Sequence, residues 1–266
     1  SKWMPPTQFD ISWESIRDLK LRVPPIELQI TIADYLEKQC SIIDELLIIV
    51  KRLLEVDSEH IQSRISDLYQ SNQSPRIPIR YLCRNTNNKA SQSLPTLSLD
   101  LVNAKKGTLN CDELPVSVGE TSTVMKIGDV AFGKLRPYLG KAFLADELIY
   151  AESEFIVLNP DQTRLHGAYL RDFLLASSTL QTLESVSTGA KMPRISWGDL
   201  ANLQIPLPSL SEQQTIAKEI DDLRKNASAR THAINKLVIL LEDLKSSVIM
   251  NQVTGQTVDV KERNLV

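Results

Sequence analysis

A gapless internal repeat is the feature that most constrains the fold of this 266-residue chain. A shift of 184 residues lays the segment that starts at Ile11 over the segment that starts at Ile195, with nine identities in 26 positions. The identical pairs are Ile11/Ile195, Ser12/Ser196, Trp13/Trp197, Leu19/Leu203, Pro24/Pro208, Gln29/Gln213, Thr31/Thr215, Ile32/Ile216 and Ala33/Ala217. Because a repeat decides architecture, we expect two copies of one unit around a middle segment, about residues 73–194, that occurs once.

Each copy has a short apolar run, a turn that contains proline, and then a long helical pattern. In the second copy Ser211 is the predicted N-cap, Gln214 occupies the capping-box position, and Gly255 ends the helix. The residues that step by fours and threes form a predicted coiled-coil seam. They are Ile216, Ile220, Leu223, Ala227, Arg230, Ile234, Leu237, Leu241, Leu244 and Val248.

The predicted helix of the first copy carries two parallel stripes of mainly apolar residues. Together they make a wider apolar surface than one helical partner covers. The seam stripe is Ile43, Leu47, Val50, Leu54, Asp57, Ile61 and Leu68, and the second stripe is Ile42, Leu46, Ile49, Leu53 and Val56. We interpret the surplus as a docking face for another protein, with a third helix from a symmetry mate as the alternative. Asp57 and Arg230 each interrupt a seam, and antiparallel pairing would bring them together to set the register.

The segment between the helices predicts mixed secondary structure. Strand-like runs begin at Ile77, Leu94, Val124, Lys141 and Ser153, and a helix is predicted from Gly167. The expected fold is therefore α+β, with one globular domain attached to two long antiparallel coiled-coil helices.

Composition excludes several classes of protein. A net charge of −3 and a hydrophobic share of 42% are ordinary for a globular chain, which argues against a disordered, collagen-like or membrane protein. Three widely spaced cysteines without a C-x-x-C motif predict neither a disulfide framework nor a zinc site, and indicate a reducing cytoplasm. Charge is segregated, because residues 73–205 hold 14 basic and 13 acidic side chains whereas residues 11–72 hold 7 and 11. The net charge therefore does not exclude an anionic partner for the middle segment.

Basic residues gather on two loops punctuated by Gly and Pro. The stretch GKLRPYLGK contains Lys134, Arg136, Tyr138 and Lys141, and the stretch TGAKMPRISW contains Lys191 and Arg194. Exposed Arg, Lys and Tyr on turns suit phosphate contacts, and Arg also suits bidentate readout of guanine. Ordinary solvated loops remain the alternative interpretation.

Enzyme motifs are incomplete in this sequence. The run GDVAFGKL has the glycine spacing of a phosphate-binding loop, but Leu135 stands where the metal-binding Ser or Thr is required, and the residues between the glycines favour a strand. His60, His166 and His232 are isolated from any nucleophile or paired carboxylate pattern. No catalytic or metal-binding residue is predicted.

The order of helix, single middle segment and second helix resembles the specificity (S) subunit of type I restriction-modification enzymes. The resemblance covers about residues 11–255 and rests on GDVAFGKLRPYLGKAFLA, SEFIVLNP, STGAKMPRIS, IPLPSLSEQQTIAKEID and KSSVIMNQVTG. It implies a target-recognition domain over residues 73–210, long conserved helices at residues 27–72 and 211–251, the end of a preceding recognition domain at residues 1–26, and a tail at residues 252–266. A full subunit of the family has two recognition domains, so the resemblance implies either a C-terminal half or a half-subunit.

The resemblance also implies a function. The recognition domain would read one half of a bipartite site in double-stranded DNA, and the helices would space the half-sites and dock modification (methyltransferase) and restriction subunits, which would hold the S-adenosylmethionine and ATP. The expected DNA contacts are Lys134, Arg136, Tyr138, Lys141, Lys191 and Arg194, with Lys105 and Lys106 as weaker backbone contacts. Leu47, Leu54, Ile234 and Leu241 are the expected seam and docking residues, and a second copy of the chain is a further candidate partner. The alternative is a coiled-coil adaptor that binds only protein, which would leave the basic loops without a role.

Overall fold

A computed structural model of the chain describes residues 23–89, 92–118, 122–189 and 191–254. The chain divides into two compact units. The larger unit spans residues 51–235, and the smaller unit combines residues 23–50 with residues 236–254. The expectations for residues 1–22, for Gly255 and for the rest of the tail lie outside the described residues.

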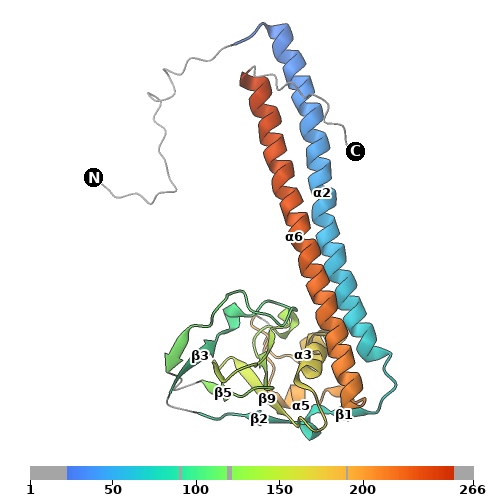
Figure 1. Ribbon diagram of the computed structural model, residues 1–266, viewed down its shortest axis with the longest axis vertical. Coiled ribbons are helices and arrows are strands. Elements are labelled where there is room, and N and C mark those ends of the chain that lie inside the picture. Colours follow the sequence, from blue (N-terminus) through green and yellow to red (C-terminus); the bar gives the residue numbers. More distant parts are fainter. Residues whose placement is uncertain (1–22, 90–91, 119–121, 190, 255–266) are drawn as a thin grey trace, which may run out of the picture. The chain divides into compact units, whose positions relative to one another are not determined.

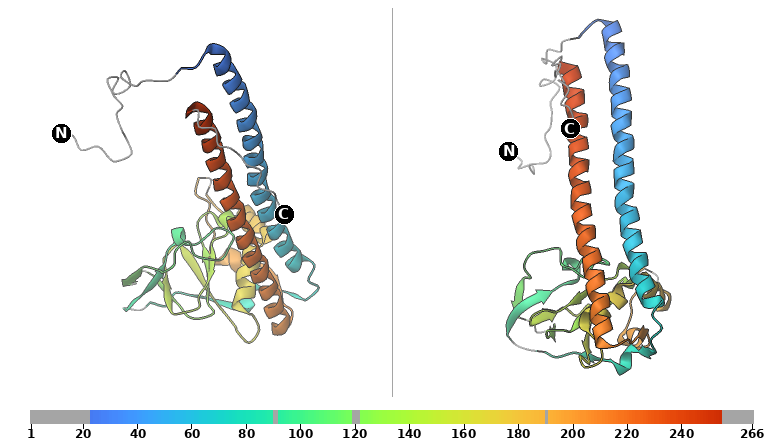
Figure 2. Two further views of the ribbon diagram at one scale, coloured as in Figure 1. Left: turned by 45° about the horizontal axis from the view of Figure 1, so that its top comes forward. Right: turned by 45° about the vertical axis from the view of Figure 1, so that its right-hand side comes forward.

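The elements follow one another in an α+β order (Figure 1). They are α2 (Ile26–Gln70), β1 (Arg76–Pro78), η1 (Ile79–Tyr81), β2 (Cys83–Thr86), β3 (Ser93–Leu97), η2 (Leu99–Leu101), β4 (Val116–Val118), β5 (Thr123–Met125), β6 (Val130–Gly133), η3 (Pro137–Leu139), β7 (Ala142–Leu144), β8 (Ile149–Ala151), β9 (Phe155–Pro160), α3 (Gly167–Leu175), α4 (Ser177–Val186), α5 (Trp197–Ala201), β10 (Gln204–Pro206) and α6 (Leu210–Thr254). Both α2 and α6 contain 45 residues and are continuous in both views of Figure 2.

The start of α6 differs from the predicted cap. The hydroxyl of Ser209 donates to the Glu212 carboxylate at 2.7 Å, and the same carboxylate accepts from the Ser209 backbone N–H at 2.9 Å. This is a capping box two residues earlier than the predicted pair of Ser211 and Gln214, so that prediction is wrong. The sequence offered two overlapping Ser-x-x-Glu/Gln matches, and the turn at Pro208 selects the first one.

Two four-stranded sheets form the middle of the larger unit. One has the order β2-β9-β6-β7, and all of its pairs are antiparallel. The other has the order β4-β3-β8-β5, in which only the β3–β8 pair is parallel. A short β1–β10 ribbon joins the segment after α2 to the segment before α6. The long predicted strand at Val124 is split into β5 and β6, because Gly128 has a φ of +89° and makes a turn between them.

The first of these sheets separates two apolar clusters. Val130, Phe132 and Leu158 belong to a cluster with α3, α4 and the adjacent parts of α2 and α6. The alternating Ala131 and Val157 belong to a second cluster with β3, β5 and β8. Since successive side chains of a strand point to opposite faces, β6 and β9 are covered on both sides, one by helices and the other by the second sheet.

Within the larger unit, α2 and α6 are joined by ion pairs in antiparallel order. The Arg230 guanidinium lies 2.7 Å from the Asp57 carboxylate, and Arg64 lies 3.0 Å from Glu219. The predicted contact between the two seam-breaking residues, Asp57 and Arg230, is therefore confirmed. In the smaller unit, Lys245 pairs with Asp44 at 2.7 Å.

The predicted seam of α6 is partly wrong. Ile234, Leu241 and Val248 are half-buried, but Leu237 and Leu244 are 44% and 50% exposed. Thr231, Val238 and Lys245 take the inward positions instead. A straight helix has 3.6 residues per turn, so its buried face drifts away from a strict 3.5-residue repeat, and the sequence pattern does not record that drift.

Candidate nucleic-acid interface

The two basic loops predicted from the sequence lie next to each other in the larger unit. The first runs from the end of β6 through η3 to β7, and the second precedes α5. The backbone N–H of Arg136 donates to the carbonyl of Pro193 at 2.7 Å, and that of Ile195 donates to the carbonyl of Lys134 at 3.0 Å. These bonds join loops that are more than fifty residues apart in the sequence.

A third segment reaches the other side of η3. The backbone N–H of Lys105 donates to the carbonyl of Gly140 at 2.8 Å. A Cβ atom on Gly140 would lie 2.9 Å from a methyl group of Leu180 and 3.3 Å from Cγ of Lys105, and Gly140 has a φ of +57°. The approach of the Lys105 segment to η3 therefore requires glycine at this position.

Lys105 and Arg136 are the only non-glycine residues with positive φ in the described part of the chain, at +59° and +49°. The left-handed conformation costs a residue with a Cβ atom about 1 kcal/mol or more, and it persists where the surrounding contacts impose it. Both residues are among the eight predicted DNA contacts, and the backbone N–H of each is hydrogen-bonded, that of Lys105 to Gly140 and that of Arg136 to Pro193. Residues held in this way are concentrated at binding sites.

The predicted side chains divide into an exposed set and an inward set. Arg136, Lys191, Arg194, Lys105 and Lys106 are exposed. The ammonium groups of Lys134 and Lys141 instead donate to the carbonyls of Ser153 at 2.5 Å and Leu99 at 2.6 Å, and Tyr138 is half-buried. Lys134 and Lys141 therefore tie the loop to neighbouring segments, whereas the exposed set faces solvent.

Carboxylates border the exposed set. The Glu154 carboxylate lies 3.1 Å from the Arg194 guanidinium. Burial, together with the carboxylates of Asp100 and Glu154, raises the pKa of the neighbouring Glu152 above its ordinary value. Within the exposed set, Arg194 has this ion pair, whereas no ion pair of Arg136, Lys191, Lys105 or Lys106 is seen among the described residues, so these four are more available than Arg194.

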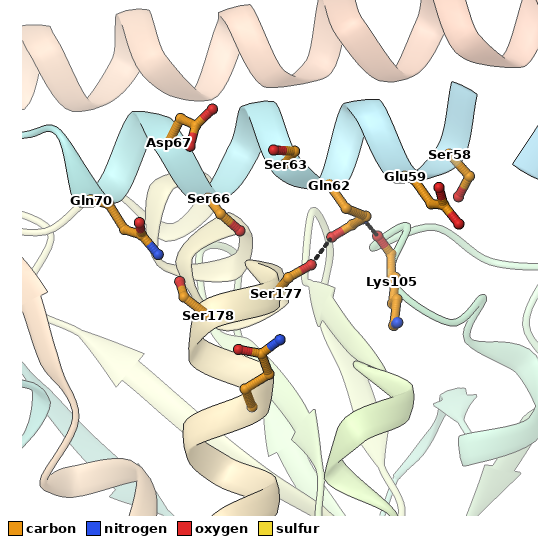
Figure 3. A pocket seen from close by; sticks show the side chains of 11 residues that line it. Ser58, Glu59, Gln62, Ser63, Ser66, Asp67, Gln70, Lys105, Ser177 and Ser178 are labelled. Atoms are coloured by element: carbon orange, nitrogen blue, oxygen red, sulfur yellow. Dashed lines mark hydrogen bonds between the residues drawn. The ribbon is translucent and has the colours of Figure 1, made fainter. Parts of the chain in front are cut away.

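Helix α2 also holds the Lys105 segment. The Gln62 carboxamide donates to the carbonyl of Lys105 at 3.2 Å and accepts from the Ser177 hydroxyl at 3.5 Å, as the dashed lines in Figure 3 show. These residues line a polar groove between α2, the start of α4 and Lys105. No sequence pattern pointed to Gln62, because its partners lie 43 and 115 positions away.

A buried charge network fixes α6 to α3, and sequence reasoning missed it. Asp172 is fully buried and accepts from Arg171 at 2.8 Å and from Arg224 of α6 at 2.5 Å. Arg171 also lies 2.9 Å from Asp221. Nearby, Tyr69 of α2 donates to the carbonyl of Tyr169 at 2.7 Å, and burial raises the pKa of Tyr69. Both helices therefore have fixed attachments to the domain that carries the basic surface.

The structure shows where the enzyme-like features of the sequence lie. The run between Gly128 and Gly133 contains β6, as its residues favoured, and is not a loop around a phosphate. His166 precedes α3, where burial and then the charge of Arg171 lower its pKa, which favours the neutral imidazole. His60 and His232 are exposed on α2 and α6. The described residues contain no group of three or more His, Cys, Asp or Glu side chains that could hold a metal ion.

The predicted docking residues face inward. Leu47 is buried, and Leu54, Ile234 and Leu241 are half-buried. The second stripe of α2 is exposed at every position, from 43% at Leu46 to 56% at Ile49. The second stripe is therefore accessible to a partner, whereas Leu47 and Leu54 lie on the seam side. None of the described helices has the length and apolarity that a membrane span requires.

Comparisons with known proteins agree with one another. The family described as type I restriction modification DNA specificity domain matches residues 61–238, which is more than half of the chain. The specificity subunit of the type I restriction enzyme EcoDI from Escherichia coli is 22% identical over 131 residues, which cover 48% of this chain and 28% of that protein.

Solved structures share the fold. A chain from a study of assembly and conformational transition of the type I R-M system has a TM-score of 0.73 at 17% identity, covering 89% of this chain and 62% of its own length. The HsdS subunit from Thermoanaerobacter tengcongensis has a TM-score of 0.52 at 16% identity, covering 96% and 65%. This chain thus spans less than two thirds of the length of each of these relatives. It belongs to the type I restriction-modification DNA specificity family.

Proposed function

We propose that this chain is a DNA-reading specificity subunit whose basic surface around η3 contacts one half of a bipartite site. The observation that carries the proposal is the meeting of three basic segments, held by backbone hydrogen bonds from Arg136 to Pro193 and from Lys105 to Gly140. The left-handed conformation of two cationic residues, Lys105 and Arg136, supports the proposal further, because such residues are concentrated at binding sites.

We assign different roles to the exposed and inward cations. Arg136 and Lys191 are the principal DNA contacts, because an unpaired guanidinium can bind a guanine edge or phosphate at once, whereas Arg194 must first leave Glu154. Lys105 and Lys106 contact the DNA backbone. Lys134, Tyr138 and Lys141 shape the loop, and their contribution to binding is indirect.

The helices provide assembly and spacing. We propose that α2 and α6 form a two-helix antiparallel coiled coil along their length, supported by the ion pairs within each unit. Its exposed stripe, with Leu46 and Ile49, docks methyltransferase subunits, through which restriction subunits join. S-adenosylmethionine and ATP belong to those partners, this chain performs no catalysis itself, and the complex acts in the cytoplasm. In this scheme the recognition domain is residues 73–210, and residues 1–26 and 252–266 flank the helices.

Binding by the isolated chain should be weak. Neutralisation of DNA phosphates provides much of the nonspecific affinity of a DNA-binding protein. Residues 73–205 have little basic excess, because they hold 14 basic and 13 acidic side chains. Strong binding is expected when partner subunits close around the duplex.

The test is the double variant Arg136→Ala with Lys191→Ala, assembled with its methyltransferase subunit. Each of the two lost contacts should cost about 1–3 kcal/mol, so affinity should fall at least about 30-fold and methylation of the cognate site should be lost. Methylome sequencing of a host that carries the complete system identifies the site and measures the loss.

A matched control is Arg84→Ala with Lys126→Ala, which removes the same charges from exposed positions on β2 and before β6. Assembly should be intact in both doubles, and methylation should persist in the control. Equal methylation in both would contradict the assigned surface. A gel shift of the assembled complex that shows no DNA binding at all would favour the protein-only adaptor.

A further inference from the structure

The loop that carries Lys105 is closed at its base by Asn103. The backbone N–H of Asn103 donates to the carbonyl of Thr108 at 2.9 Å, and the Asn103 carboxamide donates to the carbonyl of Leu109 at 2.7 Å. These bonds fix the two ends of the loop to each other. They do not reach Lys105 at the tip, so the direction of that cation depends on other elements.

Three elements hold the tip of this loop. Helix α3 lies directly against Gly107, because a Cβ atom there would be 2.9 Å from Cδ of Arg171, and Gly107 has a φ of +69°. The carbonyl of Gly140, at the end of η3, accepts from the backbone N–H of Lys105 at 2.8 Å. The carboxamide of Gln62, on α2, donates to the carbonyl of Lys105 at 3.2 Å. Lys105 therefore has one hydrogen bond on each side of its Cα atom.

The two bonds of Lys105 restrain different backbone dihedrals. Rotation about φ turns the N–H and rotation about ψ turns the carbonyl, so Gly140 restrains φ, which is +59°, and Gln62 restrains ψ. A residue with a Cβ atom keeps the left-handed conformation where surrounding contacts impose it. Loss of the Gln62 bond would remove the restraint on ψ, so that Lys105 could leave this conformation and turn its side chain in another direction.

Ser177, at the start of α4, orients the carboxamide of Gln62. The Ser177 hydroxyl donates to Oε1 of Gln62 at 3.5 Å, which leaves Nε2 turned toward Lys105 (Figure 3). Gln62 is half-buried, lines the polar groove and belongs to neither apolar cluster. Its loss would therefore open no cavity in the core, so its effect on Lys105 can be measured apart from any effect on stability.

We infer that Gln62 is a positioning residue for DNA reading. From α2 it holds Lys105 in the left-handed conformation that presents the ammonium group beside η3, and it does not contact DNA itself. This role rests on the proposed function, in which Lys105 contacts the DNA backbone. The helix that carries the proposed docking stripe thus also sets part of the DNA-contacting surface.

A double-mutant cycle tests this role in the complex assembled with the methyltransferase subunit. Gln62→Met removes the donor but keeps the length and helix propensity of the side chain. Affinity for a duplex that carries the cognate site should fall about threefold to tenfold, and its salt dependence should weaken by about one phosphate contact. In a Lys105→Ala background the same change should have no effect, because the side chain that Gln62 positions is absent. An equal fall in both backgrounds would overturn the proposal.

Gln70→Met is the matched control. Gln70 lies on the same helix, is exposed and lines the same groove. Both variants should keep the thermal midpoint of the chain within about 3 °C, and Gln70→Met should leave affinity and its salt dependence unchanged. The same loss of affinity in Gln70→Met would show that the groove matters as a whole, and would reject a specific role for the bond to Lys105.

Amide exchange of the isolated chain gives a readout without DNA. The N–H of Lys105 should exchange at least about fivefold faster in Gln62→Met, and at the parent rate in Gln70→Met. Unchanged exchange in Gln62→Met would mean that Gln62 does not restrain Lys105.

DNA binding by the assembled complex separates failure of this role from failure of the proposed function. If the double variant Arg136→Ala with Lys191→Ala loses affinity but Gln62→Met does not, the positioning role alone is overturned. If neither that double variant nor Lys105→Ala loses affinity, the assigned DNA surface is overturned, and the positioning role with it.

Discussion

The two compact units differ in how far they bury their apolar side chains. The larger unit encloses two apolar clusters, with side chains such as Phe132 and Leu158 fully buried. In the described part of the smaller unit only Ile43, Leu47 and Val50 are buried apolar residues, while Ile48 and Ile239 are 69% and 58% exposed. The part that carries the basic surface thus completes its own core, and the part made of helix ends leaves apolar surface for a partner.

Asp172 should give the largest loss of stability in the larger unit. Replacing Asp172 by Ala leaves the buried guanidinium groups of Arg171 and Arg224 without their shared acceptor, so the free energy of unfolding should fall by about 3–5 kcal/mol. Denaturant titration of the purified chain measures this loss.

Asp221→Ala is the matched control for that variant. Asp221 binds the same Arg171, but its side chain is 44% exposed, so its loss should cost about 1 kcal/mol or less. Equal losses for the two variants would show that burial of Asp172 does not govern the attachment of α6.

Leu46 and Leu47 are neighbours on α2, but Leu46 is exposed and Leu47 is buried. Leu47→Ala should lower the free energy of unfolding by about 2 kcal/mol because it opens the buried seam, whereas Leu46→Ala should change it by no more than about 0.5 kcal/mol. Denaturant titration checks the difference.

For assembly with the methyltransferase subunit, the exposed Leu46 should matter directly, whereas the buried Leu47 should matter only through folding. Leu46→Glu should leave the chain folded and weaken co-purification with the methyltransferase subunit. Leu47→Glu with Leu54→Glu should prevent complex formation as well, but by unfolding the helix pair. Normal co-purification of Leu46→Glu would reject the docking face.

The Asp57–Arg230 pair should give the smallest effect. Arg230 is 48% exposed, so a double-mutant cycle with Ala at both positions should give a coupling of about 0.2–1 kcal/mol. Zero coupling would mean that the pair follows the register of the helices and does not set it.

Prediction from the sequence succeeded where the signal is local or repeated. The long helical patterns predicted both α2 and α6. The assignment of Ile43 to the seam stripe and of Ile42 to the second stripe agrees with the burial of Ile43 and the exposure of Ile42. It failed at the cap of α6 and at Leu237 and Leu244, where competing local matches and helix geometry decide. The basic loops were recognised as candidates, but their sequence could not show that Lys134 and Lys141 turn toward backbone carbonyls.

The family, the repeat and the positions of the basic loops can be read from the sequence alone, because they are recorded in residue order. The folded chain was needed to show which cations are exposed, which residues hold them, and how Gln213 binds the loop at His166. Those outcomes depend on hydrogen bonds between backbone groups tens of residues apart, such as Arg136 to Pro193 and Lys105 to Gly140. Every residue but proline offers the same N–H and every residue the same carbonyl, so the identity of the side chain does not reveal the partner.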